Sequence, residues 1–236
     1  MRLLTPPGVF RPISDTWLLA RALERERLAP GARVLDVCSG SGALAVHAAL
    51  RGPRRHVTAV DVSRRAALTI RANAALNGVR VRVRRGDLLD AVAGESFDAI
   101  VSNPPYVPAP SDELPSRGLA RAWDGGRDGR ALLDRICARA PAHLRPGGRL
   151  LLVHSSLLGA EPTIGALQAA GLEAEVVARE PGPLGPLMRR RRAHLEEHGM
   201  LRPGQAEEEV LIVRGRAPES QSRIRALNAG ASRTRM

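Results

Sequence analysis

The sequence contains no lysine, so all 36 of its basic residues are arginines, and they outnumber the 24 acidic residues to give a formal net charge of +12. Aromatic residues make up only 2% of the chain, too few for the stacked rings that a platform for single-stranded nucleic acid needs. The charge leaves two interpretations open. It indicates either attraction to nucleic acid or a ribonucleoprotein, or the codon bias of a GC-rich genome spread over a solvated surface.

Cysteines and long apolar runs are also scarce. The chain has only Cys38 and Cys137, which excludes a disulfide scaffold and a cysteine metal cluster, and we expect no metal site. No run approaches the roughly 18 apolar residues that span a bilayer. The first residues, MRLLTPPGVFRP, lack an apolar run of secretory length. We therefore expect a cytoplasmic protein without membrane contact.

The remaining composition is that of one globular domain, with 44% apolar and 25% charged residues among 236. Short apolar runs predict strands, and amphipathic stretches between them predict helices. The strands are expected at 33–38, 56–61, 79–84, 97–102, 149–154, 172–179 and 209–214, and the helices at 14–27, 43–51, 64–77, 129–140 and 162–170. This alternation favours an α/β fold, a Rossmann-like, mostly parallel sheet with helices on both faces.

Three regions follow from the same pattern. Residues 1–30 form a helical lead-in whose helix we expect Ser14 or Asp15 to cap. Residues 31–214 form the main domain, and residues 215–236 form a basic, polar tail that we expect to be disordered. An insertion between the last two strands carries Arg189–Arg192. It is either a solvated amphipathic helix or a contact for ribosomal RNA or substrate.

A glycine turn follows the first predicted strand in the segment DVCSGSG, which begins at Asp36 and includes Gly40 and Gly42. Its spacing is not the GxGxxG of a dinucleotide site, and its leading acid suits a ligand with a positive group. Asp61 ends the next strand, where an acid accepts protons from both ribose hydroxyls. Asp87 follows the third strand and is placed to accept from an adenine amine, with Leu88 against the ring. This set resembles the class I S-adenosylmethionine methyltransferases.

The fourth predicted strand ends in Asn103, Pro104, Pro105 and Tyr106. The prolines stiffen the turn and remove two N–H groups, so carbonyl oxygens dominate its surface. The Asn103 side-chain oxygen and the Pro104 carbonyl can both accept from one NH₂ group, against which Tyr106 can pack. No strong base is present, so we expect catalysis by orientation of a conjugated amino or amide nitrogen.

Two further segments narrow the resemblance. VFRPISDTWLL, which begins at Val9, and AWDGGRDGR, which begins at Ala122, flank this turn as in the HemK/PrmC group of release-factor glutamine-N5 methyltransferases. About 30 residues precede the first predicted strand, so the chain is similar to the short branch of that group, which lacks the N-terminal helical substrate domain.

The resemblance implies a seven-stranded class I methyltransferase sheet with an antiparallel last strand and S-adenosylmethionine as cofactor. It also implies a release factor as substrate and a small zinc-binding activator subunit as partner. It places Thr16, Asp36, Cys38, Gly40, Gly42, Asp61, Asp87, Leu88 and Asn103 at the cofactor, and Asn103, Pro104, Pro105 and Tyr106 at the acceptor. Cys38 departs from the family, which usually has glycine there. The motif alone leaves adenine N6 or guanine N2 of RNA or DNA, or a small molecule, as alternative acceptors, and a non-catalytic subunit with the same fold as another alternative.

Overall fold

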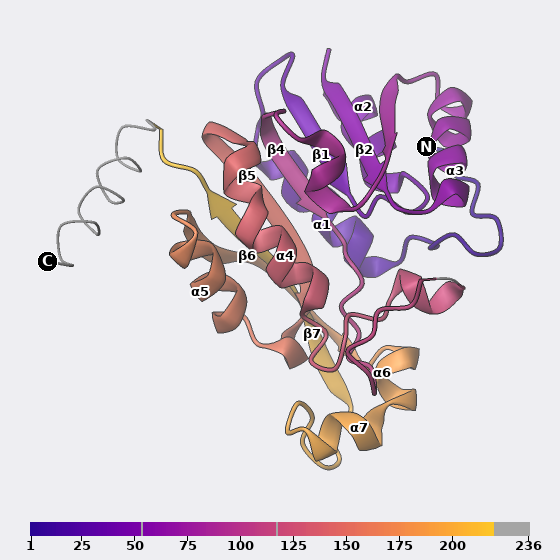
Figure 1. Cartoon of the computed structure of the whole chain (residues 1–236), viewed down its shortest axis with the longest axis vertical. Coiled ribbons are helices and arrows are strands. Elements are labelled where there is room, and N and C mark those ends of the chain that lie inside the picture. Colours follow the sequence, from indigo (N-terminus) through magenta and orange to yellow (C-terminus); the bar gives the residue numbers. More distant parts are fainter. Residues whose placement is uncertain (53, 117, 220–236) are drawn as a thin grey trace, which may run out of the picture.

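The computed structural model describes residues 1–52, 54–116 and 118–219, and its centre is one seven-stranded sheet (Figure 1). The strands run in the order β3-β2-β1-β4-β5-β7-β6. All neighbouring pairs from β3 to β5 are parallel, and β7 is antiparallel to both β5 and β6. The predicted fold class and the antiparallel last strand are confirmed. The strands are β1 (Arg33–Val37), β2 (His56–Asp61), β3 (Val81–Arg85), β4 (Phe97–Ser102), β5 (Leu144–Ser155), β6 (Glu173–Pro183) and β7 (Glu207–Arg216).

Helices cover both faces of the sheet, as the alternating pattern predicted. One face packs against α1 (Ser14–Arg25), α2 (Ala43–Arg51) and α3 (Arg64–Leu76), and the other packs against α4 (Ala131–Arg139) and α5 (Glu161–Ala169). Neighbouring side chains of β5 point to opposite faces of the sheet and pack into different hydrophobic cores. Leu150 and Leu152 face the α4/α5 side, whereas Leu151 faces the α1/α2 side, and all three are fully buried.

The helix starts differ in how well the sequence predicted them. The helix expected at 64–77 is α3, and Ser63 caps it, because its side chain accepts from the backbone N–H of Ala66. The predicted cap of α1 is wrong: Ser14 and Asp15 are its first residues, and the cap position is Ile13, which offers no side-chain bond. Asp15 is buried in the first turn, where its carboxylate accepts from the Tyr106 hydroxyl and from the N–H and hydroxyl of Thr16.

The C-terminal boundary also differs from the prediction. Strand β7 continues through Gly215 and Arg216, which pair with Leu150 and Arg149 of β5. Beyond it, the N–H of Ala217 donates to Gly148 and the side chain of Ala217 is buried. The last strand therefore extends past the predicted tail boundary at residue 215. The predicted disorder of 220–236 lies outside the described residues.

The insertion forms two short helices, α6 (Pro186–Arg190) and α7 (Arg192–Glu197), below the sheet in Figure 1. Met188, Leu195 and Leu201 are buried there against Val107, so the insertion has a small core of its own. Its arginines are largely engaged: the Arg191 guanidinium bonds Asp124 and the Pro108 carbonyl, and Arg192 pairs with Glu196. The insertion is a packed cap and not a freely solvated helix. Within the described residues, no helix is both long and apolar enough to cross a membrane.

Candidate active site

A cavity of about 390 Å³ lies at the carboxyl ends of β1, β2 and β4. Ligands of open parallel sheets bind outside the carboxyl ends of the strands, at the point where the strand order changes direction, which here lies between β1 and β4. The cavity brings together residues that the sequence analysis predicted to bind the cofactor or the acceptor. Each of them lies at the end of a strand or in the turn that follows it. Those that line it are Cys38, Gly40, Asp61, Asp87, Leu88, Asn103 and Pro105.

Asp61 is held with its carboxylate at the cavity wall. Its Oδ2 accepts from the N–H of Gly40 at 2.8 Å, and its Oδ1 accepts from the N–H of Ser63 at 2.8 Å. Burial raises the pKa of Asp61, and the two backbone donors and the nearby Arg121 oppose that rise. Each oxygen keeps a lone pair, so the carboxylate is fixed in place and still able to accept from a ligand.

The glycine turn fits closely against its neighbours. Gly40 has φ +55°, and a Cβ there would lie 3.3 Å from the Cβ of Phe10. Gly42 has φ +81°, and a Cβ there would lie 3.0 Å from Ile70 of α3. Gly42 does not line the cavity, so its part is to let α3 pack against the turn.

Asp36 differs from the role expected of it, whereas Cys38 lines the cavity. Asp36 is 1% exposed, and its Oδ2 bonds the Ser39 hydroxyl and the Ala45 N–H, so it braces the turn and does not line the cavity. Burial raises the pKa of Asp36 to about 7. Cys38 has φ +59°, a left-handed conformation that explains why glycine is usual there. Burial also raises the pKa of the Cys38 thiol, which makes it a poor nucleophile.

Asp87 and Leu88 form the wall beyond Asp61. Leu88 is buried with its backbone at φ +46°, which turns the chain under the cavity. The Asp87 Oδ2 accepts from the Arg135 guanidinium of α4 at 2.6 Å, so only Oδ1 stays unbonded within the described residues. Apolar side chains of Val60, Val62 and Leu132 complete this part of the cavity.

The Asn-Pro-Pro-Tyr turn is bonded to the start of α1. The Asn103 Nδ2 donates to the Thr16 hydroxyl at 3.1 Å, and that hydroxyl lies 3.3 Å from Oδ1 of Asp15. The Tyr106 hydroxyl donates to the other Asp15 oxygen at 2.9 Å. Because a carboxylate only accepts, the Thr16 hydroxyl donates to Asp15 and accepts from Asn103. The Asn103 amide is thereby oriented with its oxygen away from Thr16.

Thr16, Pro104 and Tyr106 do not line the cavity themselves. Thr16 is buried behind Asn103, and Pro104 is buried in the turn. Burial and Asp15 raise the pKa of Tyr106 well above its ordinary value, so the phenol stays protonated and donates. Sequence reasoning placed Tyr106 against the acceptor, whereas the structure shows its hydroxyl held by α1.

Sequence reasoning assigned no role to several cavity residues. Val9 and Phe10 reach it from the N-terminal lead-in, and Arg121 reaches it from the long loop before α4. Asp15 was considered only as a helix cap. Val9, Phe10 and Asp15 all lie in the segment VFRPISDTWLL, which carries the family resemblance. That resemblance was the only signal in the sequence that pointed to them as site residues.

The sheet order and the position of this cavity define a class I methyltransferase. The family model described as "Methyltransferase small domain" matches residues 1–114. A putative protein N5-glutamine methyltransferase of Methanocaldococcus jannaschii is 35% identical over 188 residues, which cover 80% of this chain and 93% of the relative. Methyltransferase HEMK2 of Mus musculus is 35% identical over 171 residues, which cover 70% and 80%. The chain belongs to the HemK family of protein N5-glutamine methyltransferases and is a methyltransferase.

Longer relatives and a solved structure agree with this assignment. The release factor glutamine methyltransferase of Deinococcus radiodurans is 40% identical over 182 residues, but the match spans only 64% of that protein. The fold resembles a chain of the E. cuniculi Mtq2-Trm112 complex, with a TM-score of 0.61, 24% identity, and coverage of 89% of this chain and 99% of that one. This last likeness shows the fold.

Proposed function

We propose that the cavity binds S-adenosylmethionine. Its volume lies within the ~300–1,000 Å³ of small-molecule sites. The Asp61 carboxylate would accept from the ribose hydroxyls, the Asp87 carboxylate from the adenine amine, and the apolar wall around Leu88 would cover the base. The fixed Asp61 oxygens with their spare lone pairs carry this assignment. When bound, the cofactor supplies a methyl group on a positively charged sulfur.

The substrate that the family favours is a glutamine side-chain amide of a peptide-chain release factor. Relatives of this chain are named release factor glutamine methyltransferases, and the Mtq2-Trm112 complex is described as acting on the eRF1 termination factor. The oriented Asn103 amide is the observation that supports an amide acceptor, because its oxygen is left to accept from an NH₂ group.

The residues of the turn would act by positioning. The Asn103 oxygen and the Pro104 carbonyl hold the two N–H groups of the acceptor and aim its nitrogen at the methyl group. Positive charge develops on that nitrogen during transfer, and the two oxygen dipoles stabilise it more in the transition state than in the ground state. A proton then leaves the nitrogen to solvent, since neither Cys38 nor Tyr106 is an effective base.

The test is transfer of a labelled methyl group to purified release factors, with ribosomal RNA and DNA as parallel substrates and mass mapping of the product. We expect one methylated glutamine. Label in RNA or DNA alone would show the alternative, an adenine N6 or guanine N2 methyltransferase. The reaction is run with the chain alone and with Trm112 added as a candidate activator subunit, because an Mtq2-Trm112 complex is among the related structures.

A second observation favours an additional RNA contact. A groove of about 1,240 Å³ at the amino ends of β1, β2 and β3, the end of the sheet opposite the cavity, is lined by arginines and by no acidic residue of the described chain. These are Arg33, Arg54, Arg55, Arg71, Arg80, Arg82 and Arg145. Arg33 and Arg82 pair with Glu95, and Arg145 with Asp98, but Arg54, Arg71 and Arg80 have no ion pair within the described residues. We propose that this groove, and not the insertion, contacts ribosomal RNA.

The RNA proposal is tested by fluorescence anisotropy with a ribosomal RNA fragment over a range of salt concentrations. Replacing Arg54, Arg71 and Arg80 with Ala should weaken binding and lower the slope of log affinity against log salt by about 0.7 per lost phosphate contact. Arg2, Arg25 and Arg64 are exposed, line neither the groove nor the cavity, and have no ion pair in the described chain, so the triple variant R2A/R25A/R64A removes the same charge and is a matched control. Equal losses in both variants would show a diffuse charge effect only.

A further inference from the structure

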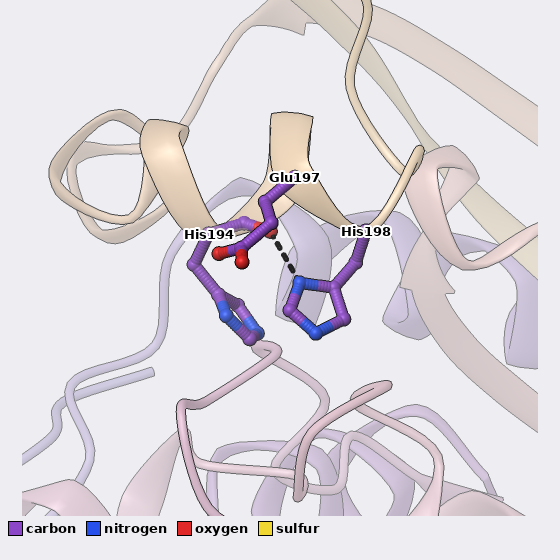
Figure 2. Close-up of side chains that lie close together, drawn as sticks. All are labelled: His194, Glu197 and His198. Carbon is purple, nitrogen blue, oxygen red and sulfur yellow. Dashed lines mark hydrogen bonds between the residues drawn. The ribbon is translucent and has the colours of Figure 1, made fainter.

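Two histidines and a glutamate gather at the end of α7, away from the methyltransferase cavity. One ligand atom from each of His194, Glu197 and His198 lies within 4.8 Å of the other two (Figure 2). The cluster is sequence-local, since the positions i, i+3 and i+4 share one face of a helix. Buried Leu195 fixes α7 against the insertion core, which keeps this face turned outward.

The second nitrogen of each histidine ring is already bonded. Nε2 of His194 lies 3.3 Å from the carbonyl of Arg127, and Nδ1 of His198 lies 2.9 Å from the carbonyl of His194. A carbonyl oxygen only accepts, so both of these nitrogens carry the hydrogen. In the neutral rings, the lone pairs are then on Nδ1 of His194 and on Nε2 of His198. Metal-binding histidines are oriented in the same way, by an N–H bond to a carbonyl on the far side of the ring.

We propose that His194, Glu197 and His198 bind a divalent transition-metal ion, with Zn²⁺ as the fitting cation. Two imidazole nitrogens and one carboxylate oxygen are donors that Zn²⁺ accepts, and solvent supplies the remaining position. Tetrahedral zinc needs its ligand atoms about 3.4 Å apart. The exposed Glu197 side chain is free to rotate toward the two imidazoles, whose orienting bonds then stay in place. This proposal departs from the expectation of no metal site, which considered cysteines alone.

The position gives such an ion a structural effect. His194 contacts the carbonyl of Arg127 in the turn before α4, and the neighbouring Arg191 binds Asp124, which lines the cavity. An ion on Nδ1 of His194 would make the Nε2–H a stronger donor to the Arg127 carbonyl, and would so strengthen the contact between the insertion and the loop that lines the cavity. Metal binding should raise the melting temperature by mass action.

The experiment is calorimetric titration of the full chain, free of any histidine tag and treated with chelator, with ZnCl₂. We expect one equivalent of Zn²⁺ to bind. H198A should bind Zn²⁺ at least about 10-fold more weakly, because removal of a residue that only orients a metal ligand already lowers metal affinity by about 10-fold or more. E197Q should also weaken binding. His56 is exposed at the start of β2 and outside the cluster, so H56A is the matched control and should bind as wild type does.

Several results would overturn the proposal. Absence of saturable Zn²⁺ binding by the wild-type chain is one, and unchanged affinity in H198A is another. Unchanged affinity in E197Q would overturn the three-ligand site. Melting curves without metal show whether each variant is folded, and a Zn²⁺-dependent rise in melting temperature in wild type that persists in H198A would place the ion elsewhere.

Discussion

The hydroxyl of Tyr106 donates to Oδ2 of Asp15 at 2.9 Å, which joins residues 91 positions apart in the sequence. The other oxygen of Asp15, Oδ1, accepts hydrogen bonds from the Thr16 hydroxyl and from the Thr16 N–H. One buried carboxylate in the first turn of α1 therefore holds both ends of the Asn-Pro-Pro-Tyr turn, Tyr106 directly and Asn103 through Thr16. We infer that Asp15 is a positioning residue for the acceptor site.

Replacing Tyr106 with Phe should lower the free energy of unfolding by about 1–2 kcal/mol, because a buried bond to a charged acceptor is lost. D15A should also be less stable, since it removes both acceptor oxygens. Both changes remove the bond between Tyr106 and Asp15, so the double variant should be less destabilised than the sum of the single variants. Urea unfolding of the four proteins measures this coupling, which should be about 0.5 kcal/mol or more.

The matched control for this cycle is Y106F combined with D98A. Asp98 pairs with Arg145 at the other end of β4 and does not contact Tyr106, so those two changes should be additive. Additive effects of Y106F and D15A as well would contradict the shared bond.

The arrangement of the sheet could be predicted, because each strand is a short apolar run and each crossover is amphipathic. The strand-end residues Asp61 and Asn103 could be placed for the same reason: parallel strands bring their carboxyl ends to one edge. The long-range bonds of Asp15 could not be predicted. A helix-start acid looks like a cap from the sequence, and only the tertiary fold shows that Tyr106 and Thr16 take up its oxygens.

The extent of β7 was missed for a different reason. Gly215 has no side chain to continue an alternating pattern, and it packs closely under α5, since a Cβ there would lie 2.9 Å from the end of the Leu172 side chain. Local polarity therefore predicted a tail where pairing with β5 continues the strand.

Replacing Asp61 with Ala should leave the fold intact and weaken binding of S-adenosylmethionine by about 2–3 kcal/mol, because a charge-assisted contact to two ribose hydroxyls is lost. Calorimetric titration measures the affinity. D112A is the control: Asp112 is an exposed acid of the loop before α4 and does not line the cavity. Unchanged affinity in a folded D61A variant would refute the cofactor site.

The stability of the ligand-free chain should depend on the titration of Asp36. Burial raises its pKa from 3.8 to about 7, so the folded state holds a proton that the unfolded state releases. The corresponding stabilisation is present below pH 4 and is lost as pH rises through about 7, a change of about 4 kcal/mol. D36N cannot ionise, so its stability relative to wild type should improve from pH 4 to about pH 7 and then level off. A difference between the two proteins that does not vary with pH would show that Asp36 is ionised throughout.

Shortening the chain should have sharply different effects at two nearby positions. A chain that ends at Glu219 should keep its melting temperature and cofactor affinity. A chain that ends at Arg214 loses the pairing of Gly215 and Arg216 with β5 and the burial of Ala217, so it should melt several degrees lower. Thermal unfolding by circular dichroism compares the two. Equal melting temperatures would mean that residues 215–217 add nothing to the sheet.

Removal of the Asn103 side chain should abolish turnover while cofactor affinity falls only modestly. By analogy with the loss of one oxyanion-hole donor, N103A should reduce kcat by about 10²–10³. N103D should keep some activity, since a carboxylate still accepts the protons of the acceptor and favours the charge that builds on its nitrogen. Single-turnover methyl transfer measures the rate, and calorimetric titration measures cofactor binding.

Thr16 supplies the finer test of the same mechanism. T16V keeps the shape of the side chain but removes the hydroxyl that orients the Asn103 amide, so kcat should fall with little change in cofactor affinity, because Thr16 lies behind Asn103 and does not line the cavity. T58V, a buried Thr-to-Val change in β2 outside the cavity lining, is the matched control and should leave the rate unchanged. A T16V variant that loses cofactor affinity but keeps its rate would assign Thr16 to the cofactor site.

For Asn103, the contradicting outcome is an N103A variant with near wild-type activity, which would place the acceptor site away from the Asn-Pro-Pro-Tyr turn.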